Sequence, residues 1–418
     1  MKEYIFTLQV ITPLFISGAD QREAELRPPS IRGALRFWFR AMVGGVVGGD
    51  RESVKDLEAK VFGDTKRMSK FGIRVKTLSS PKPAGRRVGR LGDGIAYMGA
   101  GALLRRERGG VYILTRGCYW PPDSPQDAEI PSFRMRLLLR TSDQHIKDIL
   151  LGTIWLLTTF GGLGSRIRRG FGSIAVKQAP PEYDEKYKYD QGDIIEYLKD
   201  KLRTVADACK ALAERCRITT SDIFNQSSQH PLFSCFSRWR LIVVQDDNWG
   251  GWKDVMDSMG RHLRGFRIDP GGSGRFGSTY DYRYVSLFLD NNLQTGTTYD
   301  FRNDAFGLPI QYRSYSRSTR GGQVRALLSP SSRGIDRRAS PLIIRPILIG
   351  DKWFVLLLFF NAEFLPDGTS EVLSPIRGGW PRNRPIPQPV EVKAADINLI
   401  DYYLNEVKRS FRVLGELP

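Results

Sequence analysis

The sequence predicts an α+β fold, in which antiparallel strands lie against amphipathic helices. Apolar and polar residues alternate at the start of the chain, which is the pattern of a strand with one buried face. Apolar residues then recur every three or four positions, which is the pattern of a helix with one buried face. In addition, 418 residues exceed what one hydrophobic core usually organises, so we expect two domains.

The first half of the chain contains six expected elements. Residues 4–10 form the opening strand, and Ser30 has the side chain of an N-cap for a helix over 31–43. The sequence then stays glycine-rich and poorly periodic as far as Gly110. The remaining elements are, in chain order, candidate strands at 111–115 and 133–139, a helix over 142–160 that Ser142 or Asp143 caps and Gly161 ends, and a last strand at 173–176. This order, β-α-β-β-α-β, is the ferredoxin-like or RRM-like arrangement.

The second half repeats the pattern less clearly. A charged amphipathic helix over 194–216 reads as a connector between two domains. After it we expect strands at 240–245, 340–349 and 352–360, with helices over 252–266 and 396–413. The sequence therefore predicts two ferredoxin-like domains with long insertions, at 1–180 and 231–418, and a helical connector at 181–230.

The charge of the chain points to a polyanionic partner. The formal net charge is +18, and arginine outnumbers lysine by 45 to 18. A surface that only needs solubility can use either residue, whereas phosphate recognition and base stacking favour the planar guanidinium. Nucleic acid is therefore the expected partner, and a solvated basic surface is the alternative. The longest apolar run, at 353–360, is far too short to cross a bilayer, so we expect no membrane partner and a cytoplasmic protein.

The four cysteines give no metal-binding pattern. Cys118, Cys209, Cys216 and Cys235 form no CxxC pair, so we expect free thiols and no metal site. No cofactor is expected either.

The stretch "GGLGSRIRRGFGS" at 161–173 is the most informative local feature. A P-loop needs a lysine after its last glycine. Both the P-loop and the glycine motif of Rossmann folds connect a strand to the helix that follows it. Here the loop follows a helix and precedes a strand, so a nucleotide cofactor is not expected. A helix C-cap with a tight connection would explain two of the five glycines. We predict that the rest of the loop contacts an RNA backbone through Gly162, Gly164, Arg166, Arg168, Arg169, Gly170 and Gly172.

Two further basic segments are candidates for RNA binding. Arg32, Arg36 and Arg40 lie four residues apart on the first helix, so they form one stripe that a phosphate backbone would neutralise. The alternative is pairing with acidic neighbours such as Glu23 and Glu25. In the segment 311–338, aromatic and basic residues are interleaved as in single-strand binding surfaces, although a mobile basic loop would have the same composition. The candidates there are Tyr312, Arg313, Tyr315, Arg317, Arg320, Arg337 and Arg338.

These motifs together resemble a known family. The glycine loop is similar to the signature loop of the RAMP superfamily, the repeat-associated RNA-binding proteins of CRISPR systems. "TPLFISGAD" with "ELRPPSIRGALRFWFRA" at 12–41, "NDAFGLPIQY" at 303–312 and "RRASPLIIRP" at 337–346 resemble more narrowly the first subunit family of the type III-B Cmr effector complex. The resemblance implies an RNA-binding, non-catalytic subunit of a crRNA-guided antiviral complex, whose partners are crRNA, target RNA and other Cmr subunits.

Few residues of the chain are candidates for a catalytic role. "GGDR" at 48–51 is similar to the GGDD of a cyclase-type palm, but Arg51 replaces the second aspartate, and one carboxylate cannot hold a metal pair. His262 lies among arginines that would lower its pKa, so a metal-independent endoribonuclease that processes crRNA is the enzyme alternative. A third possibility is a structural subunit whose basic faces meet acidic proteins.

Overall fold

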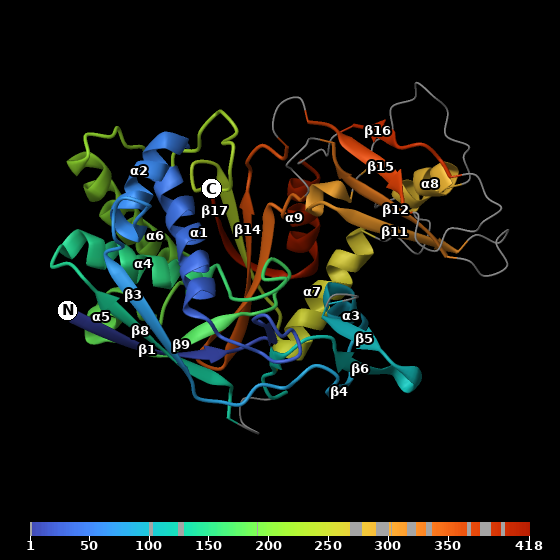
Figure 1. Ribbon diagram of the computed structural model, residues 1–418, viewed down its shortest axis with the longest axis horizontal. Helices are drawn as coiled ribbons and strands as arrows, with labels where there is room; N and C mark the ends of the chain where they lie inside the picture. The colour runs from blue at the N-terminus through green and yellow to red at the C-terminus, as the bar shows by residue number, and fades with distance from the viewer. Residues whose placement is uncertain are drawn as a thin grey trace. The chain divides into compact units, whose positions relative to one another are not determined.

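The computed structural model contains both helices and strands, as expected of an α+β protein (Figure 1). It describes residues 2–99, 103–123, 129–189, 191–267, 278–289, 301, 303–315, 323–331, 337–365, 369–376, 386–393 and 398–418. The chain divides into two compact units. Unit 1 comprises Met1–Arg261, Ile343–Ala362 and Lys408–Pro418, and unit 2 comprises His262–Leu342 and Glu363–Val407.

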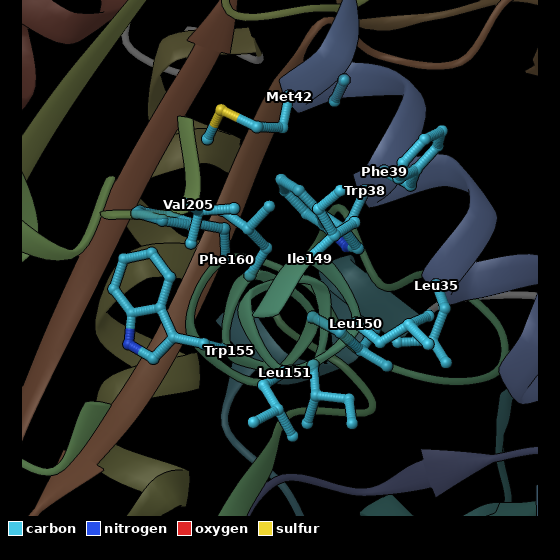
Figure 2. Packing of buried hydrophobic residues seen from close by; sticks show 14 of the residues in the cluster. Leu35, Trp38, Phe39, Met42, Ile149, Leu150, Leu151, Trp155, Phe160 and Val205 are labelled. Carbon is cyan, nitrogen blue, oxygen red and sulfur yellow. The ribbon is translucent and has the colours of Figure 1, made fainter. Parts of the chain in front are cut away.

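The first sheet of unit 1 has four antiparallel strands in the order β3-β8-β1-β9. They are β3 (Phe71–Thr77), β8 (Ser132–Leu139), β1 (Lys2–Val10) and β9 (Ile174–Gln178). Helix α1 (Pro28–Val46) follows β1 in the chain, and α4 (Gln144–Thr159) follows β8. Figure 2 shows side chains of both helices, among them Trp38 and Ile149, in one apolar cluster with Val205. The elements expected at 4–10, 31–43, 133–139, 142–160 and 173–176 are thus confirmed, with shifted ends.

The second strand of this sheet was predicted at the wrong place. It is β3, whereas 111–114 forms β6 (Val111–Leu114) in a separate small sheet with β4 (Arg87–Arg90) and β5 (Leu104–Arg106). Strand β3 has exposed basic residues on one face and only partial burial on much of the other, so its apolar alternation is weak. The remaining short elements of this half are β2 (Leu14–Phe15), α2 (Arg51–Phe62), α3 (Asp93–Gly99), η1 (Arg108–Gly110) and β7 (Cys118–Tyr119).

The two predicted helix caps have different outcomes. Ser30 does not cap α1, because the helix begins earlier, after Arg27, with prolines in its first turn. Proline is favoured there because its missing N–H has no helical partner in any case. Asp143 does cap α4, and its side chain accepts a hydrogen bond from the backbone N–H of His145 (3.0 Å).

Unit 1 also contains the second four-stranded sheet, in the order β13-β14-β10-β17. Its strands are β10 (Trp239–Gln245), β13 (Leu342–Ile349), β14 (Lys352–Phe360) and β17 (Arg412–Leu417), and the chain also forms α5 (Pro181–Tyr187), α6 (Ile194–Arg215), α7 (Trp252–Arg267) and α9 (Asn398–Ser410). The closing helix thus ends before the predicted 413, and a strand pairs with β10 instead. One apolar core contains residues of both sheets. The first sheet lies within the predicted domain 1–180 and the second within the predicted domain 231–418. The position of a sheet does not define where a domain begins and ends, and the predicted domain boundaries remain a proposal.

Unit 2 contains a sheet in the order β11-β12-β15-β16, helix α8 and most of α9. The bounds are α8 (Ser278–Leu289), η2 (Asp304–Phe306), β11 (Ile310–Tyr315), β12 (Gln323–Pro330), β15 (Glu371–Pro375) and β16 (Val390–Val392). Three carboxylates, Asp281, Asp304 and Glu371, are fully buried in this unit. Burial, with the charges of Glu371 and Asp281 added to it, raises the pKa of Asp304 well above its ordinary value.

This buried acid predicts a pH dependence of stability. Between the ordinary pKa near 3.8 and the raised folded value, the native chain retains a proton that the unfolded chain has lost. The free energy of unfolding should therefore fall as pH rises through that window, by up to about 1.4 kcal/mol per pH unit. Asp304→Asn has no such proton, so urea unfolding between pH 5 and 8 should give a flatter profile than in the wild type. Parallel profiles for the two proteins would contradict the assignment.

Candidate nucleic-acid interface

The glycine-rich loop connects α4 to β9 and folds against the segment just after β1. The backbone N–H of Gly172 donates to the carbonyl of Pro13 (3.0 Å), and that of Ser165 donates to the carbonyl of Phe15 (2.8 Å). The hydroxyl of Thr12 donates to the carbonyl of Gly170 (2.7 Å). The loop backbone is therefore held at three points by an earlier segment of unit 1.

This packing explains the glycines without a ligand. A Cβ at Gly164 would lie 2.3 Å from the carbonyl oxygen of Phe15, and one at Gly172 would lie 1.9 Å from that of Leu163. Both glycines also have positive φ, +83° and +70°. Similar contacts of 2.2–2.6 Å arise at Gly161, Gly162 and Gly170. The expectation that a cap and connection accounts for only two glycines is therefore wrong, and of the four predicted RNA-contacting glycines only Gly164 is exposed.

The three arginines of the loop remain half-exposed on this fixed backbone. Arg166, with φ of 58°, donates from Nη1 to the carbonyl of Met98 (2.8 Å). The guanidinium of Arg168 lies 5.5 Å from the ring centre of Phe37 on α1, close enough for a cation–π contact. Arg169 donates its backbone N–H to the carbonyl of Arg166 (2.9 Å). The loop thus presents three cations from a preorganised backbone.

The arginine stripe of α1 is partly neutralised from inside the protein. Arg36 and Arg40 both pair with Glu58 of α2, with 3.0 Å between Arg36 Nε and the carboxylate. Arg32 instead donates to the carbonyls of Phe62 (3.3 Å) and Phe71 (3.5 Å), and burial lowers its pKa. The predicted partners Glu23 and Glu25 are not the ones used. One carboxylate faces three arginines, so the stripe keeps a net positive charge.

Phe37 of α1 contacts the glycine loop and was not predicted. It lies on α1 next to Arg36, is partly exposed, and touches Arg168 of the loop. The structure therefore places Arg168 of the loop against α1, the helix that also carries the arginine stripe. Its signal in the sequence is weak, an aromatic residue beside an arginine in "RFWFR".

The basic segment of unit 2 is only partly as expected. Tyr312 is 3% exposed and its hydroxyl donates to Asp281 (3.1 Å), so its ring has no open face for a base, contrary to the prediction. Arg338 donates to the carbonyl of Glu363 (2.6 Å), and Arg337 is exposed. Arg313 and Tyr315 lie on β11, where their side chains are outside the described part, and Arg317 and Arg320 lie outside the described residues altogether.

The residues considered for catalysis take part in packing and in helix capping. His262 is largely buried against the ring of Tyr403, and burial lowers its pKa. Asp50 of "GGDR" caps α2 by accepting the backbone N–H of Ser53 (3.0 Å). Within the described residues, no group of three or more potential ligands is arranged for a metal ion. All four cysteines are free thiols, three of them buried.

Comparisons with known proteins agree on one family. The model of the RAMP superfamily matches residues 7–175. The CRISPR system Cmr subunit Cmr1-1 of Pyrococcus furiosus is 32% identical over 204 residues, 48% of this chain and 56% of that protein. Cmr subunit Cmr1-2 of the same organism is 30% identical over 189 residues, 42% of this chain and 96% of that protein. The crystal structure of apo Cmr1 from P. furiosus matches with a TM-score of 0.56 and 21% identity, covering all of this chain and 98% of the other, so it shows a similar fold.

Among the helices that the structure describes, none combines the length and the apolarity needed to cross a bilayer.

Proposed function

Because this chain belongs to the RAMP superfamily, and within it to the family of Cmr1 subunits, we propose that it is an RNA-binding subunit of a crRNA-guided type III-B CRISPR effector complex. Its partners are then crRNA, target RNA and other Cmr subunits. The match spans 56% of the length of Cmr1-1, so this assignment rests on the site as well as on the relationship.

The observation that carries the proposal is the surface formed by the glycine loop and α1. Arg166, Arg168 and Arg169 project from a backbone that hydrogen bonds within the protein hold in place, and Arg168 lies over Phe37 of α1. Charged donors held on a rigid backbone suit a phosphodiester chain, because little conformational entropy is lost on binding. Phe37 next to Arg168 adds an aromatic surface on which an unpaired base can stack.

We further propose that each four-stranded sheet with two helices is a ferredoxin-like domain. The order β3-β8-β1-β9, with helices after the first and third strands along the chain, supports this for the first sheet. The order β13-β14-β10-β17, with α7 and α9 in the same places, supports it for the second. In this proposal the subunit has no active site of its own, and His262, packed against Tyr403, belongs to the structural interior.

The proposal predicts the effect of changing Arg166, Arg168 and Arg169 together to alanine. Hydrogen bonds to charged groups contribute about 1.5–3 kcal/mol each, so the loss of even one should weaken single-stranded RNA binding about tenfold or more. Each lost phosphate contact should also reduce the slope of log affinity against log salt by about 0.7. Fluorescence anisotropy with labelled crRNA at several salt concentrations measures both.

A matched control removes the same charge elsewhere. Lys199, Lys201 and Lys210 lie on α6, and their joint change to alanine should leave RNA affinity nearly unchanged. If the loop variant has wild-type affinity and wild-type thermal stability, the loop is not part of the binding site.

A further inference from the structure

The outward face of the first sheet is basic. In β8 buried and half-exposed residues alternate. The buried ones are Phe133, Met135, Leu137 and Leu139, and the half-exposed ones are Arg134, Arg136 and Leu138. The second sheet differs, because most residues of β10 and β14 are buried regardless of the face they occupy. The first sheet therefore has a covered face and an open face, and only the covered face contributes to the core.

Strand pairing places like charges directly opposite each other on that open face. Arg74 of β3 is the cross-strand neighbour of Arg136 of β8, and Lys76 is the neighbour of Arg134. Directly opposed like charges destabilise a sheet. Residues two apart on one strand lie about 7 Å from each other and neighbouring strands about 5 Å apart, so all four charges fall within about one Debye length.

The rest of the chain does little to neutralise these four residues. Glu3 of β1 lies 3.4 Å from Arg136 and forms the one ion pair that the described residues provide for the group. In that same part of the chain Arg74, Lys76 and Arg134 form no ion pair, and Arg74 and Lys76 are exposed. We call Arg74, Lys76, Arg134 and Arg136 the open-face cluster.

We propose that the open-face cluster binds the phosphodiester backbone of single-stranded RNA. The inference rests on the proposed RNA-binding function and adds a second contact surface, made of residues other than those of the glycine loop and α1. A chain of regularly spaced phosphates offsets the repulsion between the opposed pairs, and each phosphate can be reached from two strands. Ile5, 43% exposed, is the cross-strand neighbour of Arg136 and gives a base an apolar contact.

The same face fits a protein partner poorly. The fully buried core of a protein interface is more apolar than its rim and is depleted in charge. Here Ile5 is the large exposed apolar residue of the three strands, and its cross-strand neighbour on β8 is Arg136. The face can therefore bury charge against phosphate but has little apolar area to bury against another protein.

The test is the variant in which all four residues of the cluster become glutamine. We expect weaker binding of labelled single-stranded RNA, with a salt slope shallower by up to about 3, which is four contacts at about 0.7 each. We also expect a higher thermal unfolding temperature without RNA, because the opposed charges are gone. The control variant, with Lys199, Lys201, Arg203 and Lys210 of α6 changed to glutamine, loses the same charge and should keep its RNA affinity.

The outcomes separate this inference from the proposed function. If the wild type binds RNA, the loop variant loses binding and the open-face variant does not, the inference is overturned while the proposed function stands. If the wild type itself fails to bind RNA, both fall. If the open-face variant keeps its RNA affinity but loses binding to polyglutamate, the surface belongs to an acidic protein, and the inference is again wrong.

Discussion

Replacing Arg345 by alanine is expected to lower the free energy of unfolding by about 3–5 kcal/mol. Arg345 lies on β13, is 1% exposed, and forms no ion pair with a carboxylate of the described residues. Its guanidinium instead donates to the backbone carbonyls of Thr158 (2.6 Å), Thr159 (3.2 Å) and Ile174 (2.8 Å). Burial lowers its pKa to about 9, so the group is still charged at pH 7.

The size of the effect follows from what the alanine variant leaves behind. The last carbonyls of a helix have no partner within the helix, and two of the three acceptors are in the last turn of α4. Without the guanidinium, two buried carbonyls and one partly buried carbonyl lose a donor, at about 1–3 kcal/mol for each group left unsatisfied. The positive charge also lies at a helix C-terminus, where the helix dipole favours it. Arg345 therefore holds the second sheet to the helix and strand that flank the glycine loop.

Urea unfolding monitored by circular dichroism measures the change. Arg345→Lys keeps a charge and should lose less stability than the alanine variant. Lys352→Ala, at an exposed position of the neighbouring strand, should stay within about 0.5 kcal/mol of the wild type. A loss below about 1 kcal/mol for Arg345→Ala would mean that water or neighbouring groups satisfy these carbonyls.

Periodicity in the sequence predicts those helices and strands that bury one face and expose the other. Strand β1 and helix α6 have clear periods of two and of three to four, and both are confirmed. Strand β3 has Arg74 and Lys76 on its open face, and the residues between them are only partly buried, so its alternation is too weak to be recognised. The α+β class could therefore be predicted, whereas the pairing of the second strand could not.

The candidate site shows the same division between local and long-range information. Its arginines are evident in the sequence, because glycine and arginine cluster within a short stretch. Their partners are not, since Glu58 pairs with α1 from another helix and Met98 accepts from Arg166 across 68 residues. Arg345 lies in an otherwise apolar strand, and its role depends on carbonyls more than 170 residues away. Such roles follow from packing, which a single sequence does not encode locally.

Gly172→Ala is the second change expected to have a large effect, with a loss of about 3–5 kcal/mol of stability. A methyl group there would lie 1.9 Å from the carbonyl oxygen of Leu163, and a φ of +70° is itself unfavourable for alanine. Relief of the clash requires the backbone to move, which disrupts the hydrogen bonds from Leu163 N–H to the Gly172 carbonyl and from Gly172 N–H to Pro13, at about 1 kcal/mol each.

Gly33→Ala is the contrasting change, and it decides what the loop glycines are for. Gly33 is exposed on α1, and a Cβ there would have no neighbour within 4 Å. Alanine should therefore stabilise the helix by about 0.5–1 kcal/mol. Thermal unfolding and RNA affinity, measured on both variants, separate the two explanations for Gly172. If the glycine serves internal packing, Gly172→Ala lowers stability in the absence of RNA; a stable variant that has lost only RNA affinity would show that the glycine is there for the ligand.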